Sequence, residues 1–328
     1  MHIFKNLLAA TAAFLFLSGT AVAEKIEINV GHVLSEQSSY QKGLVFFAEE
    51  MAKRTGGNVK VNIFSSGGLG GELRLVQGGM TGTVDAFVVG QPSLEGVVPE
   101  FKILSLPYLF DDETQAVDFL NRDLGQKMMD LLPKHQMIGL GWAGVFTRGV
   151  PANKAVDKAS DLSGLKVRVM QSPGYIATFT AFGSQSTPIP FGELFMALQT
   201  GVVDATDLSP DLVISGQFLK AIKFYSRTGI HQLPSIFVMS KAKYDSLPPD
   251  VQKTVIEVGR EAAAVSIKAQ EQLMADGLEQ MKAAGITIIS PDVASFQEVS
   301  RKAWPEIIAD VPNAQDYLNL VKSMKGAS

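Results

Sequence analysis

The chain of 328 residues contains no cysteine. It therefore has no disulfide framework and no thiolate metal ligand, and a lipid anchor attached through cysteine is excluded. Histidine is almost as scarce, with four residues: His2, His32, His135 and His231. None of them is spaced like a metal-ligand pair, and we expect neither a metal nor a cofactor. Stability must come from burial of an apolar core.

Catalytic and nucleotide-binding signatures are also missing. The glycines between positions 67 and 71 form neither a P-loop nor a dinucleotide-binding fingerprint, and no G-x-S-x-G elbow occurs. The scattered histidines do not exclude a catalytic triad, but nothing in their placement argues for one. We expect no catalytic residue.

Only the first residues form a long hydrophobic run. Lys5 supplies a positive region, residues 7–17 an apolar segment, and Ala21-Val22-Ala23 a small-residue cleavage site before Glu24. The apolar segment is short for a membrane span and lacks a following cluster of charges, which argues against an uncleaved anchor. We interpret residues 1–23 as a secretory signal peptide, and we expect no stable membrane insertion.

A strong excess of charge of either sign is absent. The signal peptide contains only Lys5, so the mature chain keeps 28 basic and 33 acidic residues. The mature chain therefore lacks the excess of basic residues that is typical of proteins that bind nucleic acid or an anionic membrane. About 300 residues are enough for two lobes or domains.

Apolar periodicity predicts strands that alternate with helices. Ile26, Ile28 and Val30 alternate as in a strand, and an apolar helical face follows over residues 44–51. A second alternating strand covers residues 59–63, and residues 84–89 form a buried type of strand. This order is typical of α/β units.

An internal repeat supports two related lobes. Gly71-Glu72-Leu73 is followed at residue 82 by the sequence GTVDA, and Gly192-Glu193-Leu194 is followed at residue 201 by GVVDA. In both places a helix ends at a glycine suited to a left-handed cap, and a strand begins at once. Residues 249–284 predict one long helix without internal proline.

The segment from Asp161 to Asp207 resembles the extracytoplasmic solute-binding proteins of TRAP (tripartite ATP-independent periplasmic) transporters. The motif GLKVRV, the helix FGELFMALQTG and the strand VVDA occur in family-like order and spacing. Other similar pieces extend over the whole mature chain, including GHVLSEQSSYQKGLVFFAEEMAKRTGGNVKV, GGLGGELRLVQGGMTGTVDA and SKAKYDSLPPDVQKTV.

The resemblance implies an α/β fold of the two-lobed periplasmic binding protein (Venus-flytrap) type, with a long helix spanning both lobes. By the same resemblance, lobe I comprises residues 24–145 and 233–273. Lobe II comprises residues 146–232 and 274–328. Composition alone does not mark these crossings, because no Pro/Gly/Ser-rich linker accompanies them.

Two arginines are the foremost candidates for ligand binding. Arg168 lies in the apolar run Leu165 to Val169, where an arginine is either exposed at a strand end, paired between lobes or holding an anion. In the resembled family, the arginine of this motif binds the carboxylate of an organic acid. Its planar fork of donors suits that geometry. Arg148, twenty residues earlier, is expected to make a second contact unless it is simply a surface arginine near a turn.

Further candidates lie where strands of an α/β lobe end, or match family positions near the cleft. Phe191 and Trp142 could instead be simple core residues, and Glu72 an ordinary first-turn glutamate favoured by the helix dipole. These candidates are Phe191, Gln91, Gln171, Glu72, His32 and Trp142. His231, close to a lobe crossing, is a weaker one.

One position departs from family members that bind sugar acids. Leu208 stands where these members often have asparagine, and leucine cannot hydrogen-bond to a hydroxyl group. This departure favours a smaller or more apolar acid, although Ser209 could restore one polar contact. Asp207 keeps an acidic group where the family usually has glutamate.

The resemblance therefore implies a periplasmic receptor for a small carboxylate that delivers its ligand to the small and large TRAP membrane subunits. Two other functions stay open. The chain could be the binding protein of another importer or of a sensor, or a secreted enzyme that acts on a carboxylate.

Overall fold

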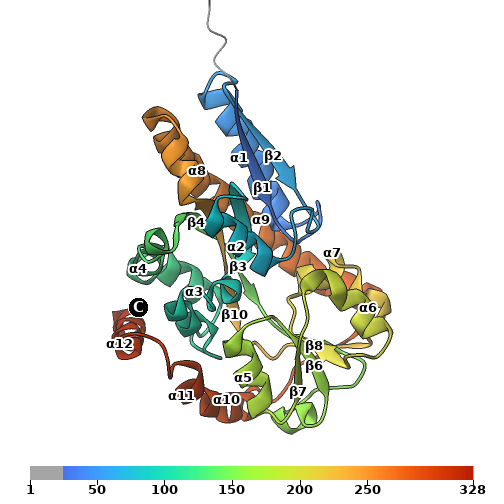
Figure 1. Cartoon of the computed structure of the whole chain (residues 1–328). Helices are drawn as coiled ribbons and strands as arrows, with labels where there is room; N and C mark the ends of the chain where they lie inside the picture. The colour runs from blue at the N-terminus through green and yellow to red at the C-terminus, as the bar shows by residue number, and fades with distance from the viewer. Residues whose placement is uncertain (1–24, 328) are drawn as a thin grey trace, which may run out of the picture.

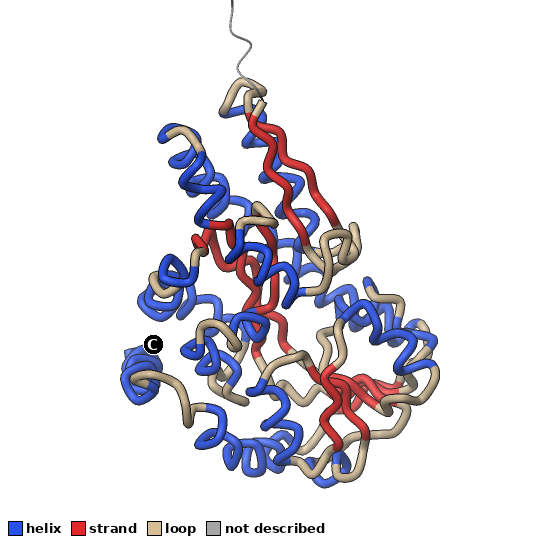
Figure 2. Tube along the Cα trace, in the orientation of Figure 1, coloured by secondary structure: helices blue, strands red, loops and turns tan. Residues whose placement is uncertain are grey.

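The computed structural model describes residues 25–327, which form two β-sheets surrounded by helices (Figures 1 and 2). The predicted signal peptide, residues 1–23, lies outside the described residues. Within the described part of the chain, no helix combines the length and the apolar character needed to cross a membrane.

The first sheet has five strands in the order β2-β1-β3-β10-β4. Strand β1 runs parallel to β2 and β3, whereas β10 lies antiparallel between β3 and β4. The bounds are β1 Ile26–Gly31, β2 Val59–Phe64, β3 Ala86–Gly90, β4 Met137–Thr147 and β10 Gln232–Ser240. The predicted alternation is confirmed, because Ile28 and Val30 are buried in the core.

Helices cover this sheet as the apolar patterns require. Helix α1 begins after Ser38, whose hydroxyl accepts from the Gln41 N–H, and it buries Leu44, Phe47 and Met51. Helix α1 covers Ser39–Arg54. The other helices are α2 Glu72–Thr81, α3 Glu113–Leu120, α4 Asp123–Met129 and α8 Lys241–Ser246. Short 3-10 helices are η1 Gln91–Leu94, η2 Pro99–Ser105 and η3 Leu132–His135.

The second sheet has six short strands in the order β11-β9-β5-β8-β6-β7. They are β5 Val150–Ala152, β6 Lys166–Val169, β7 Gln185–Pro188, β8 Ala205–Thr206, β9 Phe224–Ser226 and β11 Thr287–Ile289. The α-helices of this part are α5 Pro173–Ala181, α6 Leu194–Gln199, α7 Pro210–Ser215, α10 Val293–Ser300 and α11 Trp304–Ile307. The 3-10 helices are η4 Ala159–Leu162, η5 Phe191–Glu193, η6 Phe218–Lys220 and η7 Arg301–Ala303.

Helix α9, Pro249–Ala283, connects the two parts. It packs against α1 and β4 of the first part and against α7 and β11 of the second. Its glycines allow close approach: a Cβ atom at Gly277 would lie 2.7 Å from the Pro210 carbonyl carbon, and one at Gly259 2.8 Å from Leu140 Cβ. The predicted long helix that spans both lobes is confirmed.

The C-terminal helix α12, Ala314–Ala327, returns to the first part of the molecule, beside α4 (Figure 1). Tyr317 and Val321 are buried in one apolar cluster with Phe101 and Phe119. Lys102 forms an ion pair with Asp310 at 2.6 Å, just before this helix. Helix α12 thus packs against segments assigned to lobe I, although the predicted boundaries place it in lobe II.

Candidate functional site

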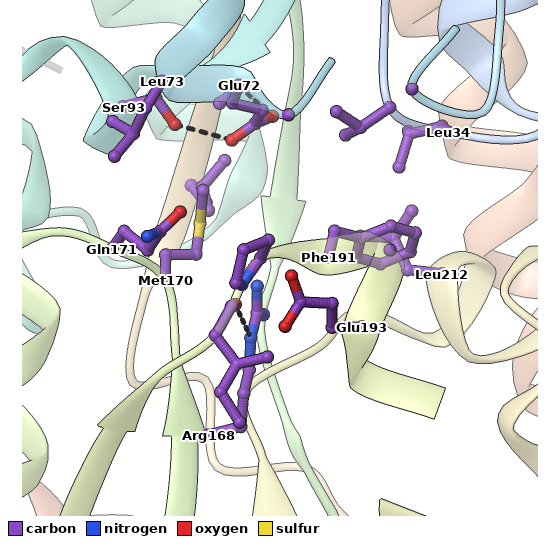
Figure 3. Close-up of a pocket in the computed structure, with 18 of the residues that line it drawn as sticks. Leu34, Glu72, Leu73, Ser93, Arg168, Met170, Gln171, Phe191, Glu193 and Leu212 are labelled. Atoms are coloured by element: carbon purple, nitrogen blue, oxygen red, sulfur yellow. Dashed lines mark hydrogen bonds between the residues drawn. The ribbon is translucent and has the colours of Figure 1, made fainter. Parts of the chain in front are cut away.

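A cavity of about 270 Å³ lies between the two sheets. One wall comes from the loop after β1, the start of α2 and the end of β3. The opposite wall comes from the end of β6, the segment after β7 and helix η5 (Figure 3). The cavity therefore lies where strands of both sheets end, which is the usual ligand position in open α/β sheets.

Arg168 projects from β6 into this cavity and is 3% exposed. Its Nε donates to the Ile189 carbonyl at 2.8 Å, which fixes the plane of the guanidinium. Among the described residues, no carboxylate lies within ion-pair distance of it, and its terminal nitrogens donate no hydrogen bond. Burial and the nearby Arg148 lower the pKa of Arg168 to about 10, so the side chain stays charged at neutral pH. An unpaired buried cation is costly, which makes this position suited to an anion.

Arg148 lies between β4 and β5 and lines the same cavity, but it is already paired. Its Nε donates to Asp207 Oδ1 and its Nη2 to the Asp207 carbonyl. Burial acts to lower the pKa of Arg148, but the charge of Asp207 prevails and the pKa lies above its ordinary value. This pairing holds the arginine in one orientation against the cavity wall.

His231 supports the same carboxylate from the other side. Its Nδ1 lies 2.9 Å from Asp207 Oδ2, and its ring stacks on Tyr175 with centroids 4.0 Å apart. Burial acts to raise the pKa of Asp207, but Arg148 and His231 outweigh it and the pKa is lowered. An ionised carboxylate only accepts hydrogen bonds, so His231 Nδ1 carries the proton.

Glu72, the first residue of α2, faces the cavity from the wall opposite Arg168 (Figure 3). Its carboxylate accepts from the Gly90 N–H at 3.0 Å and from Ser93 Oγ at 2.6 Å. Burial raises the pKa of Glu72, while these hydrogen bonds and the two arginines oppose the shift.

Two more predicted site residues, Phe191 and Gln171, also line the cavity. Together with Arg168, Arg148 and Glu72, five of the ten predicted residues are thus brought together. The structure adds lining residues that the sequence analysis missed, because no polar motif marks them. They are mostly apolar: Val33, Leu34, Tyr40, Phe146, Met170, Ile189, Pro190, Leu212 and Leu233.

The other five predicted residues do not line this cavity. Asp207 lies behind Arg148, as described. His32 is buried and packs edge-on against Tyr40, with its Nε2 2.8 Å from Gln41 Oε1. Gln91 is buried and donates to Ser105 Oγ at 2.7 Å. None of these three side chains lines the cavity.

Leu208 and Trp142 also lie outside the cavity. Leu208 is 0% exposed within the apolar core, so in this structure it forms no part of the cavity wall. Leu208 therefore neither favours nor disfavours a hydroxyl-rich ligand in this structure. Trp142 lines a separate depression between α4 and α9.

The arrangement can hold an anion but offers no metal site: residues 25–327 contain no group of three or more His, Asp or Glu that could bind a metal ion. The cavity combines one unpaired guanidinium, one paired guanidinium, the carboxylates of Glu72 and Glu193 and a largely apolar surround. Such a site fits a small organic anion held through its charged end.

The model of the family described as "Bacterial extracellular solute-binding protein, family 7" (DctP) matches residues 30–310 of the chain. A protein of Verminephrobacter eiseniae named "Solute-binding protein" is 34% identical over 273 residues, which cover 82% of this chain and 81% of that protein.

Solved structures of TRAP periplasmic solute-binding proteins share the fold. One from a Sulfitobacter species, with bound β-D-galacturonate, superposes with a TM-score of 0.88 at 25% identity and covers 90% of this chain and 99% of that one. Another from a Polaromonas species, bound to D-erythronate, gives a TM-score of 0.87 at 27% identity, with 90% and 98% covered.

Proposed function

The chain belongs to family 7 of the bacterial extracellular solute-binding proteins, and on that premise we propose that it binds one small organic acid in the cavity between its sheets, with Arg168 as the principal carboxylate contact. The family consists of solute receptors of TRAP transporters rather than enzymes.

The observation that carries the proposal is the unpaired, buried guanidinium of Arg168. Its four terminal N–H groups have no partner among the described residues, although Nε is anchored on Ile189. Two parallel charge-assisted hydrogen bonds to a carboxylate contribute roughly 1.5–3 kcal/mol each. They supply a useful part of the roughly 8 kcal/mol that corresponds to a micromolar dissociation constant.

Arg148 has a different role in this proposal. Asp207 and His231 fix its orientation, so its remaining N–H groups are presented to the ligand without a large loss of side-chain freedom. Phe191 and Gln171 complete the wall on the same side. We therefore propose Arg168, Arg148, Glu72, Gln171 and Phe191 as ligand contacts.

The position of the cavity between two sheets supports a mechanism of lobe closure. A ligand that contacts Arg168 on one wall and Glu72 on the other stabilises the arrangement in which these walls are close. Closure also removes water from the ion pair, which strengthens it. The closed receptor then transfers its ligand to the small and large membrane subunits.

The location follows from the same premise. We propose that residues 1–23 are removed during export and that the mature chain works in the periplasm. N-terminal sequencing of the protein recovered from the periplasmic fraction would test this, and a start at Glu24 is expected. Recovery of the uncleaved chain with the membrane fraction would contradict it.

A panel of acids in a thermal-shift assay tests the proposed function. The panel would contain monocarboxylates, C4-dicarboxylates, 2-oxo acids, aromatic acids and sugar acids, including D-erythronate and β-D-galacturonate. A micromolar ligand at about 1 mM should stabilise the protein by roughly 4 kcal/mol, which is a shift of several degrees. The bound acid should be recovered unchanged. A cooperative transition that no acid shifts would contradict the proposal.

A further inference from the structure

The guanidinium of Arg168 and the carboxylate of Glu72 lie on opposite walls of the cavity (Figure 3). Arg168 belongs to the second sheet, and Glu72 begins a helix that packs against the first, with the cavity between them (Figure 3). No ion pair joins them, because the salt bridges among the described residues include neither side chain. A ligand can therefore contact both only if it presents an acceptor at one end and a donor at the other.

Glu72 has acceptor capacity left. Each of its oxygens accepts one hydrogen bond within the protein, from Gly90 and from Ser93. A carboxylate offers about four lone-pair sites, so about two remain for the cavity. A hydroxyl group can donate to them, whereas a second carboxylate of the ligand cannot.

The charged side chains of the cavity favour the same class of ligand. Of the two guanidinium groups, Arg148 is neutralised by Asp207, and only Arg168 lacks a counter-charge. Glu193 also lines the cavity, but it is exposed and lies outside ion-pair distance of either arginine. One carboxylate of the ligand therefore pairs with Arg168, while a second one would be desolvated beside the carboxylate of Glu72.

The rest of the cavity wall offers few hydrogen-bond partners to a ligand with many hydroxyl groups. Apart from the charged groups, polar side chains on the wall are few, and Ser93 is already committed to Glu72. The hydroxyl group of Tyr40 is hydrogen-bonded to Ser235, which leaves Ser66 and Gln171 as the uncommitted polar side chains. Hydroxyl groups placed against Phe146, Met170 or Leu212 would lose their hydrogen bonds to water without replacement.

We propose that the cavity selects a small hydroxy-monocarboxylate with an otherwise apolar body. In this arrangement Arg168 binds the carboxylate, and Glu72 accepts a hydrogen bond from the hydroxyl group and rejects a second carboxylate. The proposal rests on the proposed function, and it makes Glu72 the residue that determines specificity.

Matched acids of equal chain length test the selection. We would measure, by titration calorimetry on the wild-type protein, butanoate, 3-hydroxybutanoate, 4-hydroxybutanoate, succinate and D-erythronate. Hexanoate, 6-hydroxyhexanoate and adipate repeat the comparison at a longer length. At one of the two chain lengths, a hydroxy acid should bind at least about tenfold more tightly than both the unsubstituted acid and the diacid of that length. The reason is that a site built to hydrogen-bond a hydroxyl group rejects analogues that lack it.

The variant Glu72→Gln isolates the charge. It keeps the shape of the side chain and a hydrogen-bonding oxygen, so the affinity of the diacid should rise relative to that of the hydroxy acid by at least about tenfold. Thermal unfolding would verify that the variant is folded. Should it not fold, the ratio measured on the wild-type protein still decides the question.

The outcomes separate this inference from the function beneath it. A diacid that binds the wild type as tightly as the best hydroxy acid overturns the inference, as does an unchanged ratio in folded Glu72→Gln. If none of these acids binds while a different acid binds through Arg168, the inference fails and the receptor function stands. If no organic acid binds at all, both fail.

Discussion

Arg168 and Arg148 line the same cavity but have different partners. Arg148 is held by Asp207, which is 59 residues away in sequence, whereas Arg168 is anchored only through Nε. The motif GLKVRV identified Arg168, and the resemblance identified Arg148. No local signal could reveal that Asp207 neutralises one and not the other, because that pairing depends on the order of β5, β8 and β6 in the second sheet.

Removing Asp207 is expected to affect both stability and binding. Asp207→Ala leaves Arg148 buried without a counter-charge, which should lower the free energy of unfolding by about 3–5 kcal/mol. It should also weaken binding of the acid, because Arg148 loses its fixed orientation. Denaturant unfolding and calorimetry would measure the two effects. Asp276→Ala, at an exposed position of α9, is the matched control, and equal behaviour of the two variants would contradict the role given to Asp207.

Asp211 predicts a pH dependence of stability. It is buried in the first turn of α7 and accepts from Ser209 Oγ at 2.5 Å, and burial raises its pKa to about 6 from the ordinary 3.8. Between about pH 4 and 6 the folded protein therefore binds more protons here than the unfolded chain, and this site loses stability as the pH rises.

Asp211→Asn removes this titration while keeping an oxygen for Ser209. Relative to the wild type, the variant should gain on the order of 2–3 kcal/mol of stability between pH 4 and pH 7, since one pKa unit corresponds to about 1.4 kcal/mol. Denaturant unfolding at both pH values measures the difference. A stability difference that is constant over this range would contradict the assignment.

At the scale of elements, the sequence predicted helices and strands correctly where apolar residues recurred with a clear helical or strand period. The strand from Ile26, the helix with Leu44 and Phe47, and the long helix from Pro249 are confirmed. The predictions could not supply the antiparallel insertion of β10 between β3 and β4, because a strand's partners are set by tertiary packing. For the same reason, the local patterns do not show that α12 packs against the first part of the molecule.

The contact between α7 and α9 depends on a glycine in the middle of a helix. A Cβ atom at Gly277 would lie 2.7 Å from the Pro210 carbonyl carbon and 3.0 Å from the Asp211 nitrogen. Gly277→Ala should therefore destabilise the protein by about 1–3 kcal/mol despite the better helix propensity of alanine.

Gly326→Ala in α12 is the matched control, because no heavy atom lies within 4 Å of the added Cβ. This variant should keep or slightly raise the melting temperature. Two equal melting temperatures would mean that the helices can move apart without loss, and that α9 does not fix the position of α7.

At the scale of the whole molecule, the two sheets and the helix α9 between them define a receptor with a central cavity. The fold is that of TRAP solute-binding proteins, while the predicted residue boundaries of the lobes stay a prediction. The family resemblance predicted this architecture because it covers the whole mature chain. Periodicity alone would have given strands and helices without their division into two sheets.

Closure around the ligand should be visible in solution. Small-angle X-ray scattering is expected to give a smaller radius of gyration with saturating acid than without it, because the ligand favours the state in which both walls contact it. The variant Arg168→Ala should show no such change at the same concentration. Identical scattering of the wild type with and without bound acid would contradict closure while leaving binding intact.

The most direct test of the central claim is titration calorimetry of the best acid against the wild type, Arg168→Ala and Arg168→Lys. Loss of one partner of a buried ion pair costs about 3–5 kcal/mol, so the alanine variant should bind about 100-fold more weakly or worse. The lysine variant should bind with intermediate affinity, because it keeps the charge without the bidentate geometry. Arg227→Ala, exposed and outside the cavity, should match the wild type. Binding by folded Arg168→Ala within about threefold of the wild type would show that this arginine does not hold the ligand.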